Sequence, residues 1–370
     1  MDENRLKDSF ARVAAHGDAV ALFFYSDLFL RQPELRDMFP LSMSAQRDRL
    51  LTALGQIVSD VGNVDSLVPF LQDLGRDHRK FGTIAGHYPA VGVSLLATLR
   101  HFSGSDWTPD LAEEWEAAYG VIASVMASAA QQEEAAPAWW DAQLISHERR
   151  SLEVAVLRLV PARWLPYLPG QSVALEVPQF RPRVWRYYSM ANAPRDDGTL
   201  DFHIRMNGGG QVSPALIRGL PVGTHVRLGP PVGTFTLDPQ ARRDILLVAG
   251  GTGLAPAKAL IEQLASQARR THLIAGGRDA DDLYDLPHLE KMAVAYPWLT
   301  VTWTAASGNP GPHAEAGTVT DILARAGTWR DHDAYVSGPS TTVTQASNRL
   351  TELGVPQDQI HVEDFGWSET

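Results

Sequence analysis

The sequence predicts three domains in a fixed order: an all-α domain, an antiparallel β-barrel, and an α/β domain with a parallel sheet. Three observations support this prediction. Through residues 1–134, apolar residues recur at helical spacing, and glycine and proline are sparse. From 139 to 237 the chain consists of short β-branched or aromatic runs separated by Pro and Gly turns. From 241 to 370, apolar strands alternate with amphipathic helices.

Length and composition also limit the function. At 370 residues the chain exceeds one ordinary core, and its net charge of -11 argues against nucleic-acid or anionic-membrane partners. There is no cysteine, which excludes disulfides, thiolate-held zinc, cysteine-ligated iron–sulfur clusters and thiolate-ligated haem. The opening residues MDENRLKDSF carry no apolar export signal, and no run has the length of a transmembrane helix. We therefore expect a cytoplasmic protein whose redox cofactor is organic, or is a metal held by nitrogen or oxygen.

Three polar residues of the helical domain lie on apolar stripes. His78 falls on the leucine face of LQDLGRDHRKFG, Tyr25 lies within AVALFFYSDLF, and Gln46 precedes Leu50 by one helical turn. Each residue alone has a simpler interpretation, because buried polar side chains usually find ordinary hydrogen-bond partners. A buried cofactor would explain all three, with His78 ligating iron while a phenol and an amide donate hydrogen bonds to a bound diatomic molecule.

A glycine-rich turn opens the α/β domain, in LLVAGGTGLAPAKAL. Glycines let a phosphate approach, and the following helix N-terminus supplies unpaired N–H groups, although many such turns carry glycine for geometry alone. After the next strand, Arg278 suits a ribose phosphate by charge, but Asp279 and further acids follow, so the choice between NADH and NADPH stays open. The candidate nucleotide contacts in this turn are Gly250, Gly251, Thr252, Gly253, Leu254 and Pro256.

The barrel carries a second set of candidate contacts, in RVWRYYSMANAP and HIRMNGGGQVS. Arginine can pair with a pyrophosphate, a tyrosine ring can stack on a flat ring system, and a hydroxyl can bond to its edge. Each piece alone could equally be a barrel wall and an ordinary turn. The candidates are Arg186, Tyr187, Tyr188, Ser189, His203, Ile204, Arg205, Gly209, Gly210, Gln211, Val212 and Ser213.

Together, and in this order, the RxYS motif, the GGQVS turn and the GGTGLAP loop resemble the ferredoxin-reductase-like family over roughly residues 140–370. The resemblance implies that the first two hold FAD and the third holds the nicotinamide nucleotide. In HVEDFGWS, Phe365 takes the place of the aromatic residue that covers the flavin, with Glu363 close by. In AYVSGPS, Ser337, Gly338 and Pro339 resemble the family's nicotinamide-side Cys-Gly-Pro turn, with Ser337 replacing the usual cysteine.

The helical domain ahead of this module resembles the globin domain of a flavohaemoglobin. The order Tyr25, Phe39, Gln46 and His78 carries the resemblance, which extends to HYPAVGVSLLATL. It implies haem b with His78 as the proximal iron ligand and a distal pair on the opposite side. The remaining implied haem-side residues are Tyr25 and Gln46 as the distal pair, Phe39 and Leu50 in the haem pocket, and Tyr88 behind the proximal histidine.

Two residues depart from the family pattern on the proximal side. Ala130 aligns with a glutamate that hydrogen-bonds to the proximal histidine in this family, and Asp77 stands where a basic residue is common. Without a carboxylate partner the imidazole is a weaker electron donor to iron. We therefore expect a divergent branch of the family, in which the activity can differ.

The resemblance implies a nitric oxide dioxygenase. Electrons would pass from NADH or NADPH through FAD to haem, and O₂ held beside Tyr25 and Gln46 would oxidise NO to nitrate. The partners would then be the small molecules O₂ and NO, with no nucleic acid and no membrane. Two alternatives remain: a haem and flavin oxidoreductase acting on peroxides or a small organic donor, and a haem-based gas sensor coupled to the reductase.

Overall fold

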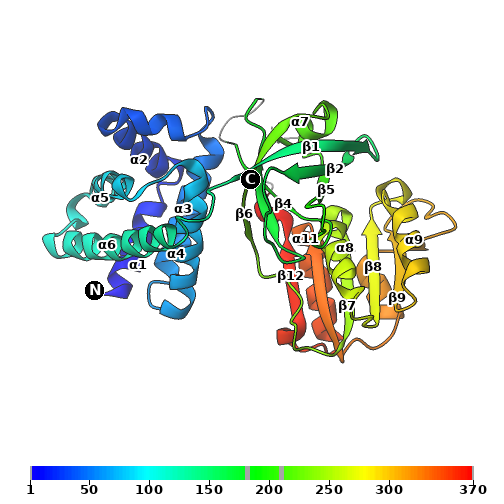
Figure 1. Cartoon of the computed structure of the whole chain (residues 1–370). Helices are drawn as coiled ribbons and strands as arrows, with labels where there is room; N and C mark the ends of the chain where they lie inside the picture. Colours follow the sequence, from blue (N-terminus) through cyan, green and yellow to red (C-terminus); the bar gives the residue numbers. More distant parts are fainter. Residues whose placement is uncertain (1, 180–183, 208–211, 369–370) are drawn as a thin grey trace. The chain divides into compact units, whose positions relative to one another are not determined.

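The computed structural model describes residues 2–179, 184–207 and 212–368. The chain divides into two compact units, Met1–Trp139 and Trp140–Thr370. Among these described residues, the first unit contains helices and no strand, and the second contains two six-stranded sheets. Figure 1 shows the helices of the first unit in blue to cyan and the sheets of the second in green to red.

Within its described residues the helical unit is built from six α-helices, and short 3-10 turns lie between α2 and α3, between α4 and α5, and between α5 and α6. Its core is a cluster of Leu, Phe, Val and Trp side chains contributed mainly by α1, α2, α5 and α6. The elements are α1 (Glu3–Ala14), α2 (Asp18–Arg31), η1 (Pro33–Met38), α3 (Ser44–Ser59), α4 (Val64–His78), η2 (Arg79–Phe81), η3 (Ala85–His87), α5 (Tyr88–Ser103), η4 (Gly104–Asp106) and α6 (Pro109–Gln132).

Helices α4 and α6 approach each other at a glycine. A Cβ on Gly75 would lie 2.3 Å from the Met126 carbonyl oxygen, so a larger residue there would force the two helices apart. His78 lies about one turn beyond Gly75 on α4, and Ala130 lies about one turn beyond Met126 on α6. The end of α4 that carries the histidine is therefore held close to the C-terminal part of α6.

The first sheet of the second unit is a nearly closed antiparallel barrel. Its strand order is β4-β3-β6-β1-β2-β5, and an isolated bridge between Met190 and Phe202 links the two edges. Alternate side chains of the strands fill the interior, among them Leu144, Leu157 and Leu175. The elements are β1 (Trp140–Arg149), β2 (Val154–Pro161), β3 (Ser172–Glu176), β4 (Arg186–Ser189), β5 (Leu200–Arg205), α7 (Val212–Arg218) and β6 (His225–Val232).

The second sheet is parallel and follows the order β10-β9-β8-β7-β11-β12. Strand β7 lies in the middle, and the chain runs outward from it first to β8 and β9 and later to β11 and β12. The elements are β7 (Asp244–Gly250), η5 (Gly251–Gly253), α8 (Leu254–Leu264), β8 (Thr271–Gly277), η6 (Ala280–Asp282), α9 (Leu286–Ala295), β9 (Leu299–Ala305), β10 (Glu315–Ala316), α10 (Val319–Arg325), β11 (His332–Gly338), α11 (Ser340–Glu352), η7 (Gln357–Gln359), β12 (Ile360–Asp364) and η8 (Phe365–Ser368).

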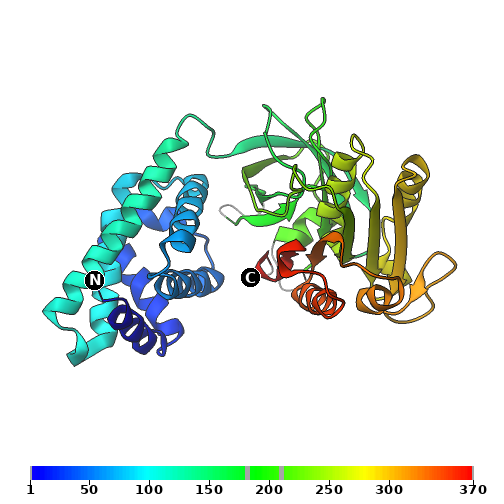
Figure 2. The same ribbon diagram turned by 90° about the horizontal axis from the view of Figure 1, so that it is seen from below.

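Helices cover both faces of this parallel sheet (Figure 2). Along β7, Ile245 and Leu247 pack against α8 and α9, whereas Leu246 and Val248 pack against α10 and α11. Because successive side chains of a strand point to opposite faces, a strand covered on both sides is a continuous apolar run, as ILLVA is here. The run ILLVA itself offers no polar side chain, and the glycine-rich segment follows at the carboxyl end of the strand.

No single helix in the described part of the chain is both long and apolar enough to cross a membrane. The pair α1 and α2 meets the criteria of length and composition when taken together, but the two helices are bent by 95° where they join. Both helices contribute buried residues to the core of the helical unit.

Candidate functional site

In the helical unit, the structure brings the predicted distal residues together. The Gln46 Nε2 of α3 donates a hydrogen bond to the hydroxyl oxygen of Tyr25 on α2, at 3.1 Å. The Phe39 ring packs edge-on against the Tyr25 ring with centroids 5.4 Å apart, and Leu50 packs against the same core. Four side chains that the sequence analysis grouped by function therefore contact one another or one shared cluster.

The Tyr25 phenol is a neutral donor in this setting. Burial raises the pKa of Tyr25 to about 12, and the hydrogen bond from Gln46 offsets only part of this effect. Since Gln46 uses a lone pair of the phenol oxygen, the O–H proton stays available for a further acceptor. The arrangement can donate a hydrogen bond to a small molecule placed beside the ring.

On the other side of the predicted site, His78 is the last residue of α4. Its Nδ1 lies 2.7 Å from the Leu74 carbonyl oxygen, and a carbonyl can only accept, so Nδ1 carries the proton and Nε2 keeps a lone pair. Burial lowers the pKa of His78, against the opposing effect of Asp77, so the imidazole is neutral. A neutral imidazole with a free Nε2 is the form that ligates a metal.

The two departures on the proximal side are visible in the structure. The Tyr88 hydroxyl is buried and has no hydrogen-bond partner among the described residues. Ala130 offers it no carboxylate, and the next three residues of the chain, 131–133, are exposed. Asp77 forms an ion pair with the buried Lys80. Among the described residues, the hydrogen bond of the His78 ring goes to the neutral Leu74 carbonyl, while the Asp77 carboxylate acts on the ring through its charge alone.

These residues fit a haem. Histidine is the natural nitrogen ligand in a chain without cysteine, and here its tautomer is fixed by the Leu74 carbonyl. In the same helical unit, the buried Tyr25 and its partly buried partner Gln46 provide hydrogen-bond donors for a ligand of the metal. Arg49 of α3 acts on both regions. Burial raises the pKa of Tyr25 and the charge of Arg49 opposes this in part, whereas burial lowers the pKa of Lys80 and the charge of Arg49 adds to this.

In the second unit, the RxYS motif forms strand β4, and the C-terminal turn η8 lies against it. Tyr188 is partly buried and packs against the barrel core, and burial raises the pKa of its hydroxyl. Arg186 donates from Nη1 to the Trp185 carbonyl oxygen, at 3.0 Å. The RxYS strand and the C-terminal segment that begins η8 with Phe365 are thus neighbours, although nearly 180 residues separate them in sequence.

Glu363 stands directly before this turn, on β12, where it is paired in register with Ser337 of β11. Burial raises the pKa of Glu363 to about 7, and the negative charge of Asp364 adds to the shift. No described residue forms a hydrogen bond or ion pair with its carboxyl group. A partly buried, unpaired carboxyl group just before the turn that contacts β4 suits hydrogen bonding to a polar ring edge, so the residues present also fit a flavin.

The predicted GGQVS turn is only partly described. Gly209, Gly210 and Gln211 lie outside the described residues. Val212 is buried at the start of α7, and the Ser213 hydroxyl accepts a hydrogen bond from the Asn207 backbone N–H, at 2.9 Å. The described part therefore brings the two ends of the turn together through Ser213.

Along β5, the three predicted contacts point to two different faces. Ile204 enters the barrel core, whereas His203 and Arg205 face α8 and η6. The His203 Nδ1 lies 2.8 Å from the Tyr284 hydroxyl, and Arg205 forms ion pairs with Glu153 and Asp282. The side chains of His203 and Arg205 are therefore engaged where the barrel meets the parallel-sheet domain.

The glycine-rich loop packs tightly against the Ser-Gly-Pro turn. A Cβ on Gly253 would lie 2.2 Å from the Ser337 carbonyl oxygen, and a Cβ on Gly338 would lie 2.8 Å from the Gly250 oxygen. Gly251 and Gly338 also have positive φ values, of 54° and 143°. Glycine is therefore required here for close approach and for backbone conformation. The loop ends at the N-terminus of α8, where unpaired N–H groups suit a phosphate, so these residues fit a nucleotide.

Ser337 itself is fully buried. Its hydroxyl donates to the Gly253 carbonyl oxygen, at 2.8 Å, and so links β11 to the glycine-rich loop. Pro256 and Leu254 are buried in the first turn of α8, and Pro339 precedes α11. Ser337, which replaces the family's usual cysteine, therefore holds the glycine-rich loop to β11 through this hydrogen bond.

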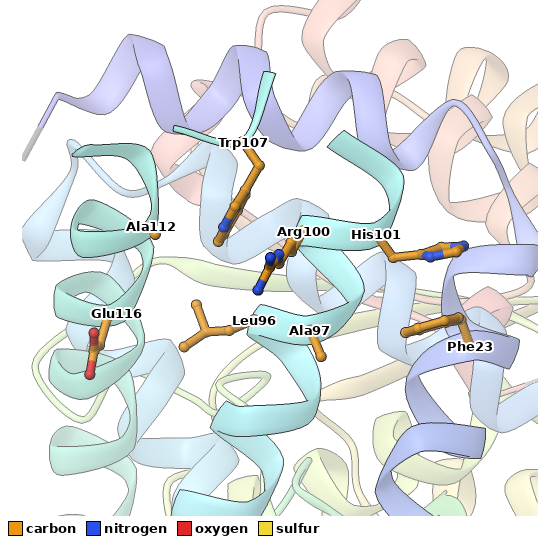
Figure 3. Close-up of a pocket in the computed structure, with 8 residues that line it drawn as sticks. All are labelled: Phe23, Leu96, Ala97, Arg100, His101, Trp107, Ala112 and Glu116. Carbon is orange, nitrogen blue, oxygen red and sulfur yellow. The ribbon is translucent and has the colours of Figure 1, made fainter. Parts of the chain in front are cut away.

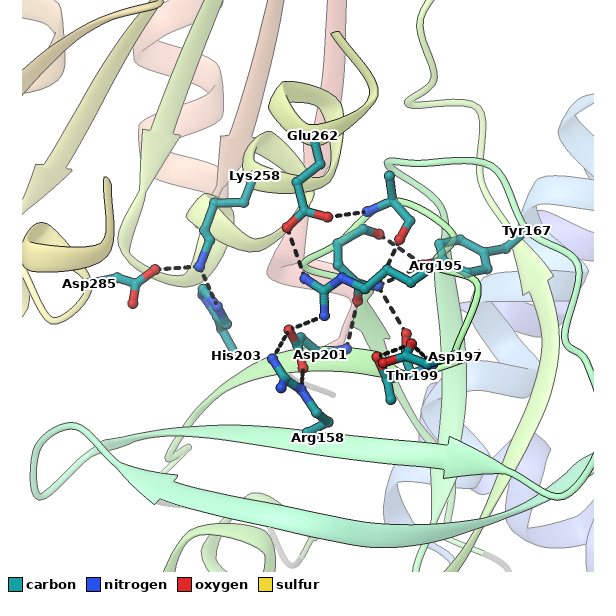
Figure 4. Close-up of polar contacts among 12 residues, drawn as sticks. Arg158, Tyr167, Arg195, Asp197, Thr199, Asp201, His203, Lys258, Glu262 and Asp285 are labelled. Atoms are coloured by element: carbon teal, nitrogen blue, oxygen red, sulfur yellow. Dashed lines mark hydrogen bonds and ion pairs between the residues drawn. The ribbon is translucent and has the colours of Figure 1, made fainter. Parts of the chain in front are cut away.

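Sequence reasoning missed a buried ionic cluster beside these loops (Figure 4). The Lys258 Nζ of α8 lies 2.6 Å from Asp285 Oδ2 and 3.5 Å from His203 Nε2. Burial and the positive charge of Lys258 lower the pKa of His203 well below its usual value, so the ring is neutral. One signal was available in the sequence: Lys258 interrupts the otherwise apolar helix LAPAKALIEQL.

A second network fastens the barrel to α8, and sequence reasoning missed it too. Arg195 bridges Asp201 on β5 and Glu262 on α8, with N–O distances of 2.8 and 2.9 Å (Figure 4). Arg158 binds the same Asp201 through two nitrogens, at 2.6 and 2.9 Å. Burial alone would raise the pKa of Asp201, but the two guanidinium groups lower it overall, so the carboxylate is ionised.

The helical unit also has an open hollow of about 540 Å³ that contains none of the predicted haem residues (Figure 3). The Phe23 and His101 rings are stacked on its border, with centroids 4.3 Å apart. Its lining residues are Phe23, Leu96, Ala97, Arg100, His101, Trp107, Ala112 and Glu116.

The chain is similar to known proteins along its whole length. The globin family model matches residues 22–126, the "Oxidoreductase FAD-binding domain" model matches 141–237, and the "Oxidoreductase NAD-binding domain" model matches 247–348. The flavohemoprotein of Bordetella parapertussis is 28% identical over 380 residues, which cover 95% of this chain and 94% of that protein. The flavohemoprotein of Bacillus subtilis is 27% identical and covers 98% of this chain and 96% of its own. The chain belongs to the flavohaemoglobin family.

A solved structure agrees with this assignment at the level of the fold. The flavohemoglobin from Malassezia yamatoensis, determined with bound FAD and heme, superposes with a TM-score of 0.82 at 18% identity and covers 98% of each chain. The predicted fold class, a globin domain followed by a barrel and a parallel-sheet domain, is confirmed. The chain is an NAD(P)H-dependent flavohaem oxidoreductase, and its cofactors are haem, FAD and NAD(P)H.

The assignment of His78 as the haem ligand can be tested by spectroscopy. We expect His78→Ala to yield protein without a haem Soret band, because the described helical core offers no second neutral imidazole in the same place, while flavin absorbance survives. His101→Ala, a change at an exposed histidine of the same unit, should keep both bands. A normal Soret band in His78→Ala would refute the ligand assignment.

Proposed function

We propose that this chain is a nitric oxide dioxygenase. Each NO would combine with one O₂ and one electron to give nitrate, so that one NAD(P)H, which gives up a hydride carrying two electrons, supports two turnovers. The observation that carries the proposal is the pairing of a neutral, buried Tyr25 phenol with Gln46 in the same helical unit as a histidine whose Nε2 is free. The 28% identical flavohemoproteins support it along the whole chain.

When bound, FAD converts the two electrons of a hydride into single electrons, and the haem iron supplies the centre at which O₂ and NO react. The protein's own part begins on the distal side. Tyr25 keeps its proton because of its high pKa, and it donates that hydrogen bond where negative charge develops on oxygen. Gln46 orients the phenol, and the Phe39 ring restricts its rotation.

On the proximal side, His78 would hold the iron through Nε2, with its ring oriented by the Leu74 carbonyl. In the second unit, Arg186, Tyr188 and Ser189 on β4, together with Ser213, would hold FAD, with Phe365 and Glu363 at its ring. The glycine-rich loop and the Ser337–Pro339 turn would hold the nicotinamide nucleotide, with Ser337 keeping the loop in place.

The decisive experiment is NO consumption by the purified, haem- and FAD-loaded protein. We expect NAD(P)H to stimulate NO loss in air, with nitrate as the product and two NO consumed per NAD(P)H oxidised. Tyr25→Phe should slow the rate by roughly 10²-fold, because it removes one preorganised donor to the developing negative charge. Tyr119→Phe, whose hydroxyl donates to the Tyr88 carbonyl instead, is the matched control. Absence of stimulation by NAD(P)H would rule the proposal out.

A second candidate is a haem and flavin oxidoreductase acting on peroxides or a small organic donor. The observation that favours it is the neutral proximal side, where the Tyr88 hydroxyl has no described partner and Ala130 provides no carboxylate. An imidazole bonded only to a carbonyl donates less electron density to iron than one bonded to a carboxylate. Steady-state comparison of NO, peroxide and organic donors separates the two candidates.

The weaker electron donation from His78 to iron can be reversed by one substitution. Ala130→Glu should place a carboxylate near the end of α4 and make His78 a stronger donor, which raises the iron–histidine stretching frequency of the ferrous protein in resonance Raman spectra. Ala130→Gln has the same size without the charge and should leave the band near its wild-type position. Equal spectra for the two variants would contradict this account of the proximal side.

Glu363 predicts a pH dependence of flavin reduction. Its pKa of about 7 means that the carboxyl group is neutral at lower pH and charged at higher pH. A charged carboxylate beside the flavin opposes the negative charge that reduction brings, so reduction by NADH should slow as the pH rises through about 7. In anaerobic stopped-flow measurements, Glu363→Gln should lack this step, and Asp358→Asn, an exposed site before β12, should keep it. A step that persists in Glu363→Gln would assign it to another group.

A further inference from the structure

Two arginines lie near the carboxyl end of β8, and both are paired with carboxylates. Arg278 follows β8 directly, and its Nε lies 2.7 Å from Asp282 Oδ2 while its Nη2 lies 2.9 Å from Glu153 Oε2. Arg205 reaches the same two acids, with Nη2 at 3.0 Å from Asp282 Oδ1 and Nη1 at 3.2 Å from Glu153 Oε2. These four residues, Arg205, Arg278, Asp282 and Glu153, form one neutral array, which we call the Arg278 array.

The Arg278 array borders the nucleotide loop. A Cβ on Gly251 would lie only 3.7 Å from Arg205 Nε, so the guanidinium group stands next to the glycine-rich turn. The loop after β9 is fastened to the same place, because Ser307 donates both its N–H and its hydroxyl to the Arg278 carbonyl oxygen, each at 2.8 Å. In doubly wound sheets, dinucleotides bind across the carboxyl ends of adjacent strands, with the ribose beside the strand that follows the glycine-rich turn.

The sequence offers few other cations along this edge. Between residues 276 and 316 the only lysine or arginine besides Arg278 is Lys291, on α9. His313 in the loop after β9 pairs with Glu290 at 2.9 Å. Asp279 and Asp281 are exposed beside the array, and neither forms an ion pair with Arg278 or Arg205 among the described residues. The ends of β8 and β9 therefore present more carboxylate than cation.

The Asp282 carboxylate of the array is charged at any physiological pH. Burial would raise the pKa of Asp282, but the guanidinium groups of Arg278 and Arg205 outweigh it and hold the value at about 2. A 2′-phosphate would have to displace these carboxylates from both arginines and then lie beside them, whereas a 2′-hydroxyl can donate a hydrogen bond to a carboxylate.

We infer that this chain uses NADH and discriminates against NADPH, because Asp282 and Glu153 occupy the arginines that would otherwise bind a 2′-phosphate. The inference rests on the proposed function in one respect, which is that the glycine-rich loop binds the nicotinamide nucleotide. Arg278, which by sequence alone suits a phosphate, is thereby a residue that orients the carboxylates of the array.

The test is nucleotide binding to the FAD-loaded full chain. Calorimetric titration with NAD⁺ and NADP⁺, and anaerobic reduction of the flavin by NADH and NADPH, should favour the non-phosphorylated nucleotide by at least about tenfold in the wild type. Asp282→Asn should strengthen NADP⁺ binding by about tenfold, because it frees Arg278 and Arg205 from one carboxylate. Glu153→Gln, at an exposed turn of the barrel where folding is not at risk, should act in the same direction.

Asp281→Asn is the matched control, since Asp281 lies in the same turn and pairs with neither arginine. The ratio of its affinities for NAD⁺ and NADP⁺ should stay at the wild-type value. Equal or tighter binding of NADP⁺ by the wild type would overturn the inference, as would an unchanged ratio in both Asp282→Asn and Glu153→Gln. Because neither readout involves NO, a failure of NO consumption leaves this result standing, and a failure here leaves the dioxygenase proposal standing.

Discussion

The hydrogen bond from His78 Nδ1 to the Leu74 carbonyl decides what the helical unit can do. It joins two residues one turn apart on α4, so its geometry is built into the helix and needs no other partner. By placing the proton on Nδ1 it leaves Nε2 as the only nitrogen with a lone pair. Burial keeps the ring neutral, and the close approach of α4 and α6 at Gly75 fixes the helix that carries it.

The reductase unit depends on a different constraint, the burial of paired charges between the barrel and the parallel sheet. Arg195 joins Asp201 of strand β5 to Glu262 of helix α8, the helix that begins at the nucleotide loop. Lys258 of the same helix pairs with Asp285 and lies 3.5 Å from His203 of β5. Lys258 and Asp285 are both buried, and removing one partner of such a pair typically costs roughly 3–5 kcal/mol, because the other charge is left without compensation. The position of the glycine-rich loop relative to the barrel is therefore held by electrostatics as well as by apolar packing.

Much of the fold could be predicted from the sequence, because the signals are local. Helical spacing in the first unit, short strands between Pro and Gly turns, and the continuous apolar run ILLVA each identify their element without reference to the rest of the chain. The candidate site was partly accessible in the same way: Tyr25, Gln46 and His78 stood out as polar residues on apolar stripes. Lys258 could be detected in the same way, as a polar residue in an apolar helix. The cluster could not be predicted, because its other members, His203 and Asp285, come from distant segments.

By itself, the sequence determined the order of the domains, the absence of thiol chemistry, and the positions where glycine permits a phosphate to approach, since these follow from residue type and spacing. Only the tertiary structure decided how the charged residues are used. Arg278 by its charge suited a ribose phosphate, with acids following it in the sequence, but only the fold shows that Asp282 and the distant Glu153 engage it. The resemblance implied Tyr88 behind the proximal histidine, but only the fold shows that its hydroxyl is buried without a described partner. Charge and hydrogen-bonding capacity belong to a residue, but their availability depends on neighbours that only folding brings together.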